Sequence, residues 1–256
     1  MTELYRYRHL LIGWTLREIK VRYKQSLLGA AWAVLQPLSI MLVFSLVFGY
    51  LLQVPADGVP YPVFSYAALV PWTFLATSIT FAVPSLVNNM NLVTKVYLPR
   101  QIFPIASVAA SFVDFLIASV VFAAMMLAFG VAFTPALLAL PLIVGIEIVL
   151  ILGVVLLASA VNVFYRDIRF VVPLGMQLWM YLTPIIYPVS QVPPAAEPYF
   201  MLNPMAGLVE AYRAVTLHGR WPEWSTLGTA GLVSLAIFVA GYTYFRRTEW
   251  QFADII

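Results

Sequence analysis

Long apolar stretches that carry almost no charge follow one another along the chain and set its expected architecture. They occupy residues 31–52, 63–83, 102–132, 135–164, 170–187 and 224–245. Within them the only charged residues are Asp114 and Glu147. Because a helix crosses a hydrocarbon core of roughly 30 Å with about 20 apolar residues, each stretch predicts a transmembrane helix. We therefore expect a single domain, residues 1–256, that is all-α, integral to the membrane and built on six transmembrane helices.

The composition agrees with this pattern and removes several classes of chemistry. Of the residues, 62% are hydrophobic and 10% are charged, and the mean hydropathy is +0.92. A soluble globular chain carries about 25% charged residues, so part of this surface must face lipid. Cysteine is absent, which excludes disulfides and thiolate chemistry. His9 and His218 fit no metal-ligand pattern, and we expect neither a metal site nor catalytic residues.

Lysine and arginine residues collect in the connections on one side of the predicted spans. Of the 14 such residues, twelve fall on that side: Arg6, Arg8, Arg17, Lys20, Arg22, Lys24, Lys95, Arg100, Arg166, Arg169, Arg246 and Arg247. The other two are Arg213 and Arg220. Because cytoplasmic connections carry the excess of positive charge, we expect both termini in the cytoplasm. The net charge of +3 then reflects topology, and no nucleic-acid partner is expected.

The N-terminal residues 1–30 predict an amphipathic helix at the cytoplasmic interface. Leu4, Tyr7, Leu11 and Trp14 share one face at helical spacing, and basic residues crowd the remainder. Such a helix lies in the headgroup layer and contacts membrane lipid. Two interpretations stay open: a simple basic anchor, or a lever that contacts both a cytoplasmic partner and the first span.

The connection between the second and third spans, residues 85–101, is bracketed by Pro84 and Pro99 and alternates polar with apolar residues. Its notable side chains are those of Asn88, Asn89, Leu92, Lys95, Val96 and Tyr97. A short amphipathic helix held at the cytoplasmic surface is suited to docking in a partner's groove. An interfacial turn and a cap for the third span are the alternatives.

The long connection at residues 188–223 predicts a re-entrant helix on the outer face. Its apolar part, residues 201–217, is short for a straight crossing, and a full crossing would place the C-terminus outside. Such a segment must be shielded from lipid by neighbouring protein.

The charged residues within and beside the spans admit a functional and a static interpretation. A carboxylate at the bilayer centre costs about 2.5–3.5 kcal/mol, so Asp114 and Glu147 should face protein or water. For Glu147 we favour a static hydrogen bond to Ser, Thr or Tyr on a neighbouring span, and for Asp114 the choice stays open. Arg166 and Asp167, with Arg169, form either a local ion pair or a contact to a coupling partner.

Aromatic residues gather near the predicted outer face, where most would form an interfacial belt. They are Tyr61, Tyr66, Trp72, Phe74, Tyr181, Tyr187, Tyr199, Phe200, Trp221 and Trp224. A minority could line a path, because flat rings suit the C–H faces of sugars. Our candidates for a substrate pathway are Phe44, Trp72, Asp114, Trp179, Tyr181 and Tyr187.

The motifs that would make this chain an ATPase or a lipid-modifying enzyme are missing. No GxxxxGK[ST] phosphate loop, paired-aspartate motif or Ser/His/Asp set occurs. If ATP drives this protein, another subunit hydrolyses it. A membrane-embedded enzyme acting on a polyprenyl lipid would need polar residues that converge at one membrane face. A scaffold without a transport role is the last alternative, and it would not need a set of ordered sequence motifs.

Five stretches together resemble the ABC-2-type polysaccharide export permeases, a group that includes O-antigen, capsule and teichoic acid exporters. They are RYKQSLLGAAW at 22–32; LVPW at 69–72 with Asn88, Asn89 and KVYLP at 95–99; FYRDI at 164–168; TPIIYP at 183–188; and LNP at 202–204 with EAYR at 210–213. Their order and spacing cover essentially the whole chain. One departure is the single lysine before the Leu-Pro pair of residues 85–101, where relatives often carry more cations.

The resemblance implies a homodimer in a bacterial cytoplasmic (inner) membrane, together with two copies of a separate ABC ATPase subunit that binds ATP and Mg. It implies no cofactor in this chain and a lipid-linked polysaccharide substrate, an undecaprenyl-diphosphate-linked glycan such as O-antigen. Residues 85–101 would be the coupling helix. The residues we assign to coupling are Arg17, Arg22, Tyr23, Asn88, Asn89, Leu92, Lys95, Val96, Tyr97, Arg166 and Asp167. An ABC-2 exporter of drugs or small lipids is the alternative.

Overall fold

The fold is seen in a computed structural model that describes residues 7–24, 28–95, 98–193 and 195–252. Within these ranges every regular element is a helix. In chain order the elements are α2 (Arg8–Tyr23), η1 (Gly29–Ala31), α3 (Trp32–Phe44), η2 (Ser45–Leu51), α4 (Tyr61–Ala82), α5 (Ser85–Asn88), α6 (Met90–Lys95), α7 (Ile102–Ala128), η3 (Pro135–Ala139), α8 (Leu140–Phe164), α9 (Ile168–Tyr181), η4 (Val189–Gln191), α10 (Glu197–Met201), α11 (Pro204–Thr216), α12 (Trp224–Thr248) and η5 (Glu249–Gln251).

Five helices among the described residues are long and apolar enough to cross a membrane. They are Trp32–Leu51, Tyr61–Ala82, Ile102–Ala128, Pro135–Phe164 and Trp224–Gln251. The first is α3 continued without a break by the π-helical η2. These five correspond to the first four and the last of the predicted spans.

The predicted fifth span, residues 170–187, differs from the structure. The helix there, α9, covers Ile168–Tyr181 and has 14 residues, which is too short to count among the membrane-crossing helices. At 1.5 Å per residue it extends about 21 Å, less than the roughly 30 Å of a hydrocarbon core. The helix stops early because Pro184 lacks a backbone N–H and disfavours helical geometry in the residue before it.

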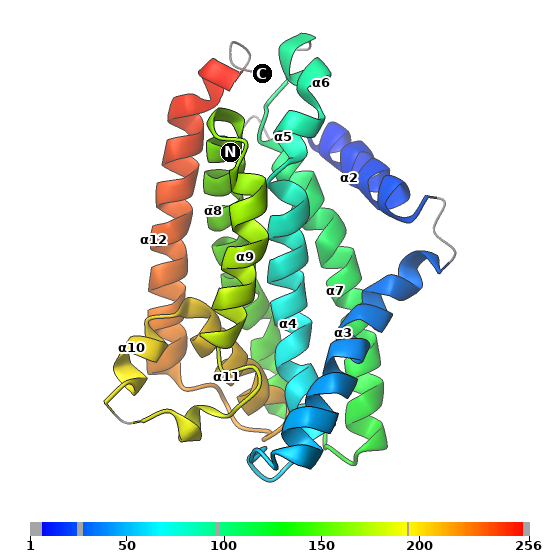
Figure 1. Ribbon diagram of the computed structural model, residues 1–256, viewed down its shortest axis with the longest axis vertical. Coiled ribbons are helices and arrows are strands. Elements are labelled where there is room, and N and C mark those ends of the chain that lie inside the picture. The colour runs from blue at the N-terminus through cyan, green and yellow to red at the C-terminus, as the bar shows by residue number, and fades with distance from the viewer. Residues whose placement is uncertain (1–6, 25–27, 96–97, 194, 253–256) are drawn as a thin grey trace.

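The helices run up and down between two distinct ends of the bundle (Figure 1). One end, at the top of the view, carries α2, α5, α6, the connection from α8 to α9 and the end of α12. The opposite end carries α10, α11 and the connection from η2 to α4. The helix α11 is therefore reached and left at the same end, as a re-entrant segment requires.

The helix α4 forms the centre of the bundle, with α3, α7, α8, α9 and α11 around it. Its buried face includes Phe64, Tyr66, Leu69 and Phe74. Hydroxyl groups on this helix bond to its own backbone, as when Thr77 donates to the carbonyl of Thr73 at 2.7 Å. A helix that is apolar on all sides is buried in this way, because no face of it needs water.

The helices α8 and α12 pack with almost no space between their backbones. A Cβ atom on Gly241 would lie 2.2 Å from the carbonyl oxygen of Gly153. A Cβ atom on Gly153 would lie 2.6 Å from the backbone nitrogen of Phe238. Small residues at such contacts let membrane helices associate through van der Waals packing, since lipid supplies no hydrophobic driving force.

Replacing Gly241 with alanine is expected to lower the free energy of unfolding by about 1–3 kcal/mol, because the added methyl group has no space against α8. Gly228→Ala on the same helix is the matched control, since a Cβ there meets no atom within 4 Å. Denaturant unfolding of both purified variants in detergent measures the difference. Equal stabilities would contradict the close packing.

Candidate functional site

The helix α2 rests on the connection that follows α4. Trp14 packs edge-to-face on Phe103 in the first turn of α7, with ring centroids 5.0 Å apart. The Arg17 guanidinium lies 4.3 Å from the centroid of the Trp14 ring and donates a hydrogen bond of 3.1 Å to Oδ1 of Asn89. Asn89 in turn donates to the carbonyl of Ser85 at 2.8 Å. Two of the residues assigned to coupling, Arg17 and Asn89, are thus in direct contact.

The outward face of α2 is more apolar than the predicted stripe suggested. Leu11 and Trp14 are half-buried, and Leu4 lies outside the described residues. Ile12, Leu16 and Val21 are exposed, although the prediction placed mainly basic residues there. An interfacial helix accommodates both faces, because the headgroup layer receives apolar side chains as well as cations.

The connection at residues 85–101 contains two short helices, α5 and α6, instead of the single helix predicted. Leu92 is half-buried and packs against a buried inner cluster. That inner cluster consists of Leu86, Phe103, Leu156, Ala160, Val163, Phe245 and Phe252. Asn88 and Asn91 are exposed. Val96, Tyr97 and the side chain of Lys95 lie outside the described part of the chain.

An ion pair joins the last turn of α2 to the interior of α7. Arg22 pairs with Oδ2 of Asp114, and the Tyr23 hydroxyl donates to Oδ1 of the same carboxylate. Arg22 also donates to Oγ of Ser111 at 3.3 Å and lies 4.0 Å from the ring centroid of Phe81. Because the side chains of Arg22 and Asp114 are only 11% and 14% exposed, solvent screens this pair weakly.

The position of Asp114 makes these partners necessary. It lies twelve residues beyond Ile102, where α7 begins, or about 18 Å along the helix. Burial, together with the hydrogen bond to Asp114, raises the pKa of Tyr23 to about 12. The phenol therefore keeps its proton at neutral pH and continues to donate. Two charge-assisted hydrogen bonds offset the cost of removing the carboxylate from water.

A cavity of 170 Å³ lies beside this ion pair, between α2, α3, α4 and α7. Polar side chains from three of these helices line it together with the ion pair: Gln36, Thr73, Thr77 and Ser111. Arg22 and Tyr23, assigned to coupling, and Asp114, assigned to the pathway, therefore belong to one cluster. The sequence could not reveal this, because Arg22 and Asp114 are 92 residues apart.

The opposite end of the bundle is organised by an arginine that the sequence patterns assigned only to an outer connection. Arg213, on α11, is 1% exposed and donates to the carbonyl oxygens of Pro184 and Ile185 at 2.6 and 2.8 Å. Its guanidinium also lies 3.6 Å from the ring centroid of Phe64. An arginine inside the largely apolar residues 201–217 was the signal available, because intramembrane charges mark specific partners.

The N-terminus of α11 also bonds to the end of α9 and to the residues that follow it, through the side chain of Asn203. The side chain of Asn203 caps α11 by accepting from the backbone N–H of Met205 at 3.1 Å. It also accepts from Nε1 of Trp179 at 2.9 Å and donates to Oγ1 of Thr183 at 3.0 Å. The end of α9 is therefore bonded to both ends of the re-entrant helix.

The hydrogen-bond partner of Glu147 is a tyrosine, one of the expected residue types, and it lies on the re-entrant helix instead of a span. Its Oε2 atom accepts a hydrogen bond of 2.7 Å from the hydroxyl of Tyr212 on α11. Both residues are buried, so this bond joins α8 to the re-entrant helix within the protein interior.

The aromatic pathway candidates fall into separate contacts. Trp72 is 5% exposed and packs edge-to-face on Trp179, with centroids 6.1 Å apart. Tyr187 donates to the carbonyl of Tyr181 at 3.2 Å, and the Tyr181 side chain is exposed. Phe44 packs on Phe48 in the first span, with ring centroids 5.6 Å apart. Trp72 therefore contributes to packing inside the protein, whereas the ring of Tyr181 is exposed on its surface.

The remaining coupling candidates lie at the connection from α8 to α9. Arg166 and Asp167 are exposed there, and the Asp167 carbonyl accepts from the backbone N–H of Phe170 at 2.9 Å at the start of α9. Arg169 lies over the Phe170 ring at 4.7 Å. The connection from α8 to α9 lies at the same end of the bundle as α5 and α6 (Figure 1).

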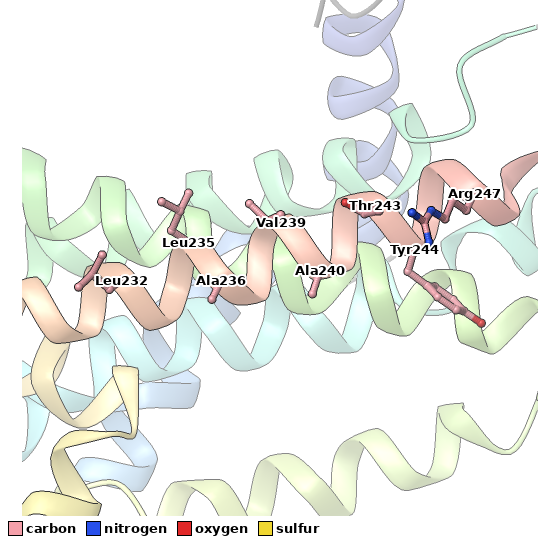
Figure 2. A pocket seen from close by; sticks show the side chains of 8 residues that line it. All are labelled: Leu232, Leu235, Ala236, Val239, Ala240, Thr243, Tyr244 and Arg247. Carbon is pink, nitrogen blue, oxygen red and sulfur yellow. The ribbon is translucent and has the colours of Figure 1, made fainter.

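The outer surface of α12 is an apolar face with a cation at its end (Figure 2). A groove of 690 Å³ there is lined by Leu232, Leu235, Ala236, Val239, Ala240, Thr243, Tyr244 and Arg247. Leu232 and Val239 are among the exposed large apolar residues. This lining suits contact with acyl chains. Among the described residues no group of three or more His, Asp or Glu could hold a metal ion.

Several long apolar helices, an interfacial helix bonded into the bundle and a re-entrant helix at the other end define a multi-pass membrane protein. The chain belongs to the ABC-2 type transporter family, whose model matches residues 10–217. Such a permease pairs with an ABC ATPase in a transporter complex. The candidate site is therefore part of a transporter subunit.

Relatives with known roles match nearly the full length of the chain. The chain is 31% identical to the O-antigen export system permease protein RfbA of Myxococcus xanthus, over 99% of this chain and 98% of the relative. It is 28% identical to a protein of the same name from Klebsiella pneumoniae, over 96% and 95%. It is 25% identical to the polysialic acid transport protein KpsM of Escherichia coli, over 91% of each.

The ion pair should show strong coupling in a double-mutant cycle. We expect Arg22→Gln and Asp114→Asn each to cost about 1–3 kcal/mol of stability, and the double variant to cost at least about 1 kcal/mol less than their sum. Denaturant unfolding in detergent measures all three variants.

The more exposed pair Arg246–Glu249, at 2.7 Å, is the control for that cycle. Its coupling energy should stay below about 0.5 kcal/mol, because water screens it. Additive effects of the Arg22 and Asp114 substitutions would show that the two side chains do not interact.

Proposed function

We propose that this chain is the permease subunit of an ATP-driven exporter of lipid-linked polysaccharide. The substrate class is an undecaprenyl-diphosphate-linked glycan such as O-antigen. The near full-length similarity to permeases named for O-antigen export and polysialic acid transport supports this class. An ABC-2 exporter of drugs or small lipids is the second candidate, because the family model alone does not distinguish the cargo.

The proposed topology has six crossings with both termini in the cytoplasm of a bacterium, and the membrane is its inner membrane. The end of the bundle with α2, α5, α6 and the α8–α9 connection carries most of the cations, so it faces the cytoplasm. Arg213 and Arg220 lie at the other end. The fifth crossing consists of α9 and residues 182–187, which α11 shields from lipid through the bonds of Arg213 and Asn203.

Coupling to the ATPase is proposed to use α2 and residues 85–101 as one unit. The observation that carries this proposal is that α2 touches both the Asn89 side chain and Asp114, which lies deep in α7. A movement of the ATPase against residues 85–101 and α2 would be transmitted to α7 through these charged contacts as well as through apolar packing. Two copies of the ABC ATPase would bind ATP and Mg, and this chain would hold no cofactor.

A second copy of the chain is proposed to cover the apolar faces of the first span and α9. Leu42, Val43 and Leu46 are more than half exposed, and so are Phe170 and Leu174 on α9. The glycan would pass between the two protomers. The exposed ring of Tyr181 lies on one of these faces, where it suits contact with sugar rings.

The orientation is tested by cysteine labelling in intact cells, for which the natural absence of cysteine gives a clean background. Asn91→Cys on α6 should resist a membrane-impermeant maleimide until the cells are opened. Ser190→Cys, exposed at the opposite end, should react from outside and is the matched control. Labelling of Asn91→Cys from outside would overturn the topology.

The same Asn91→Cys variant should form a cross-link to lysines of the ATPase through a reagent with one maleimide and one succinimidyl ester in the assembled transporter, whereas Ser190→Cys should form none. Failure of Asn91→Cys to cross-link, with a normally assembled complex, would contradict the docking assignment of residues 85–101.

Reconstitution of the permease with its ATPase in liposomes tests the function itself. ATP should expose lipid-linked glycan to a glycosidase outside the vesicles. Asp114→Asn should lower the export rate about tenfold while ATP hydrolysis continues, because the push on α2 no longer reaches α7 through a charge-assisted bond.

Two controls make this assay decisive. Gly228→Ala should export at the unaltered rate, since it changes no contact. Movement of a fluorescent phospholipid or drug without any glycan would favour the alternative cargo.

A further inference from the structure

A second polar cavity lies at the end of the bundle that carries α11, in the angle between α11 and the start of α12. Its volume is 220 Å³. Its polar lining comes from Glu210 on α11, from Arg220, Trp221 and Glu223 in the connection to α12, and from Thr226 on α12. This volume is below the roughly 300–1,000 Å³ of pockets that enclose drug-sized ligands, so it suits a single ring-sized group.

The connection that forms this cavity is held in one conformation. Gly219 has a φ of +61°, and a Cβ atom there would lie 2.6 Å from Cγ2 of Thr134. The backbone N–H of Arg220 donates to the carbonyl of Ala214 at 2.9 Å. These contacts fix the backbone of the connection before any ligand arrives, which lowers the entropic cost of binding.

The carboxylate of Glu223 is also fixed in place. It accepts hydrogen bonds from Oγ of Ser225 at 2.7 Å and from Oγ1 of Thr226 at 3.1 Å. Each carboxylate oxygen has further acceptor capacity, so both bonds leave room for a ligand hydroxyl.

The mixture of groups around the cavity selects a polyhydroxylated ring. Glu210 and Glu223 accept hydrogen bonds, Arg220 donates them, and Trp221 offers a flat apolar face. An anionic ligand would be repelled by the two carboxylates, whereas a cationic headgroup would use the carboxylates and leave the donors of Arg220 without an acceptor. A sugar residue satisfies all four groups, because its hydroxyls both donate and accept and its C–H face packs on an indole ring.

The two neighbouring tryptophans separate this interpretation from an ordinary interfacial belt. Trp221 and Trp224 are 54% and 59% exposed, and their rings are stacked with centroids 6.5 Å apart. Of these two tryptophans, Trp221 lines the cavity and Trp224 does not. A belt would use both rings alike, since each has an apolar body and a polar N–H.

We propose that this cavity is a carbohydrate-binding site that holds one sugar residue of the glycan on the outer face of the permease. The inference rests on the proposed function, because the glycan reaches this face only after export. It adds a glycan contact outside the path between the two protomers. A phospholipid headgroup is the competing occupant.

The experiment uses the complete transporter in phosphatidylcholine nanodiscs and lipid-free glycan released by mild acid from the source strain's polymer. Saturation-transfer NMR should detect the glycan on the unaltered transporter. Trp221→Ala should weaken binding about three- to tenfold, and Trp221→Phe should restore most of it. Glu210→Gln should also weaken binding, whereas Trp224→Ala should change it less than about twofold.

Three results would overturn the site: no glycan signal on the unaltered transporter, equal effects of Trp221→Ala and Trp224→Ala, or competition by soluble phosphocholine but not by excess glycan. The export assay keeps the two proposals apart. If Trp221→Ala binds glycan normally while export proceeds, only the site fails; if the unaltered transporter exports no glycan, the proposed function fails.

Discussion

A carboxylate placed deep in an apolar helix bundle must find partners inside the protein, and the partners of Asp114 come from α2. Arg22 and Tyr23 reach it from the last turn of that helix, and Ser111 completes the arrangement. Removing the carboxylate would leave a guanidinium in surroundings that favour it only as part of a pair. The interfacial helix is therefore bonded to the bundle at its deep end, while its middle rests on Asn89. This double attachment is what makes α2 more than a basic anchor.

The same constraint acts at the opposite end with the signs reversed. When α9 ends after Tyr181, carbonyl groups that no longer have helical partners would be exposed to lipid. Arg213 supplies donors to two of them, and Asn203 bonds to the neighbouring Thr183 and Trp179. The helix α11 thus provides the hydrogen bonds that a short, broken span lacks. The short fifth span therefore depends on the re-entrant helix, which bonds to the carbonyl groups that the span leaves without partners.

Apolar surface is divided between packing inside the protomer and contact outside it. The helix α4 is buried on nearly all sides, and α8 and α12 approach each other through Gly153 and Gly241. In contrast, α9 buries only Met176. A helix with so little of its surface covered needs a partner, either lipid or a second protomer. This is why we propose that a second protomer covers α9 and that the glycan passes there.

The sequence by itself determined the class of protein, the number of apolar runs, the cationic end and the family resemblance, because hydropathy and charge are local properties. It also pointed to the static bond of Glu147, since a buried carboxylate requires a donor. It did not determine that α9 would end at Tyr181, that Leu92 would pack against the inner cluster, or that Arg213 would be buried.

The tertiary structure decided these points. Arg22 and Asp114 were assigned to different roles, and only folding brings together residues separated by 92 positions. The outer cavity likewise combines α11, a turn and α12. Contacts of this kind depend on how each helix is rotated about its axis and how deep it lies in the membrane. Many weak packing contacts together determine both, and no single segment of the sequence encodes them.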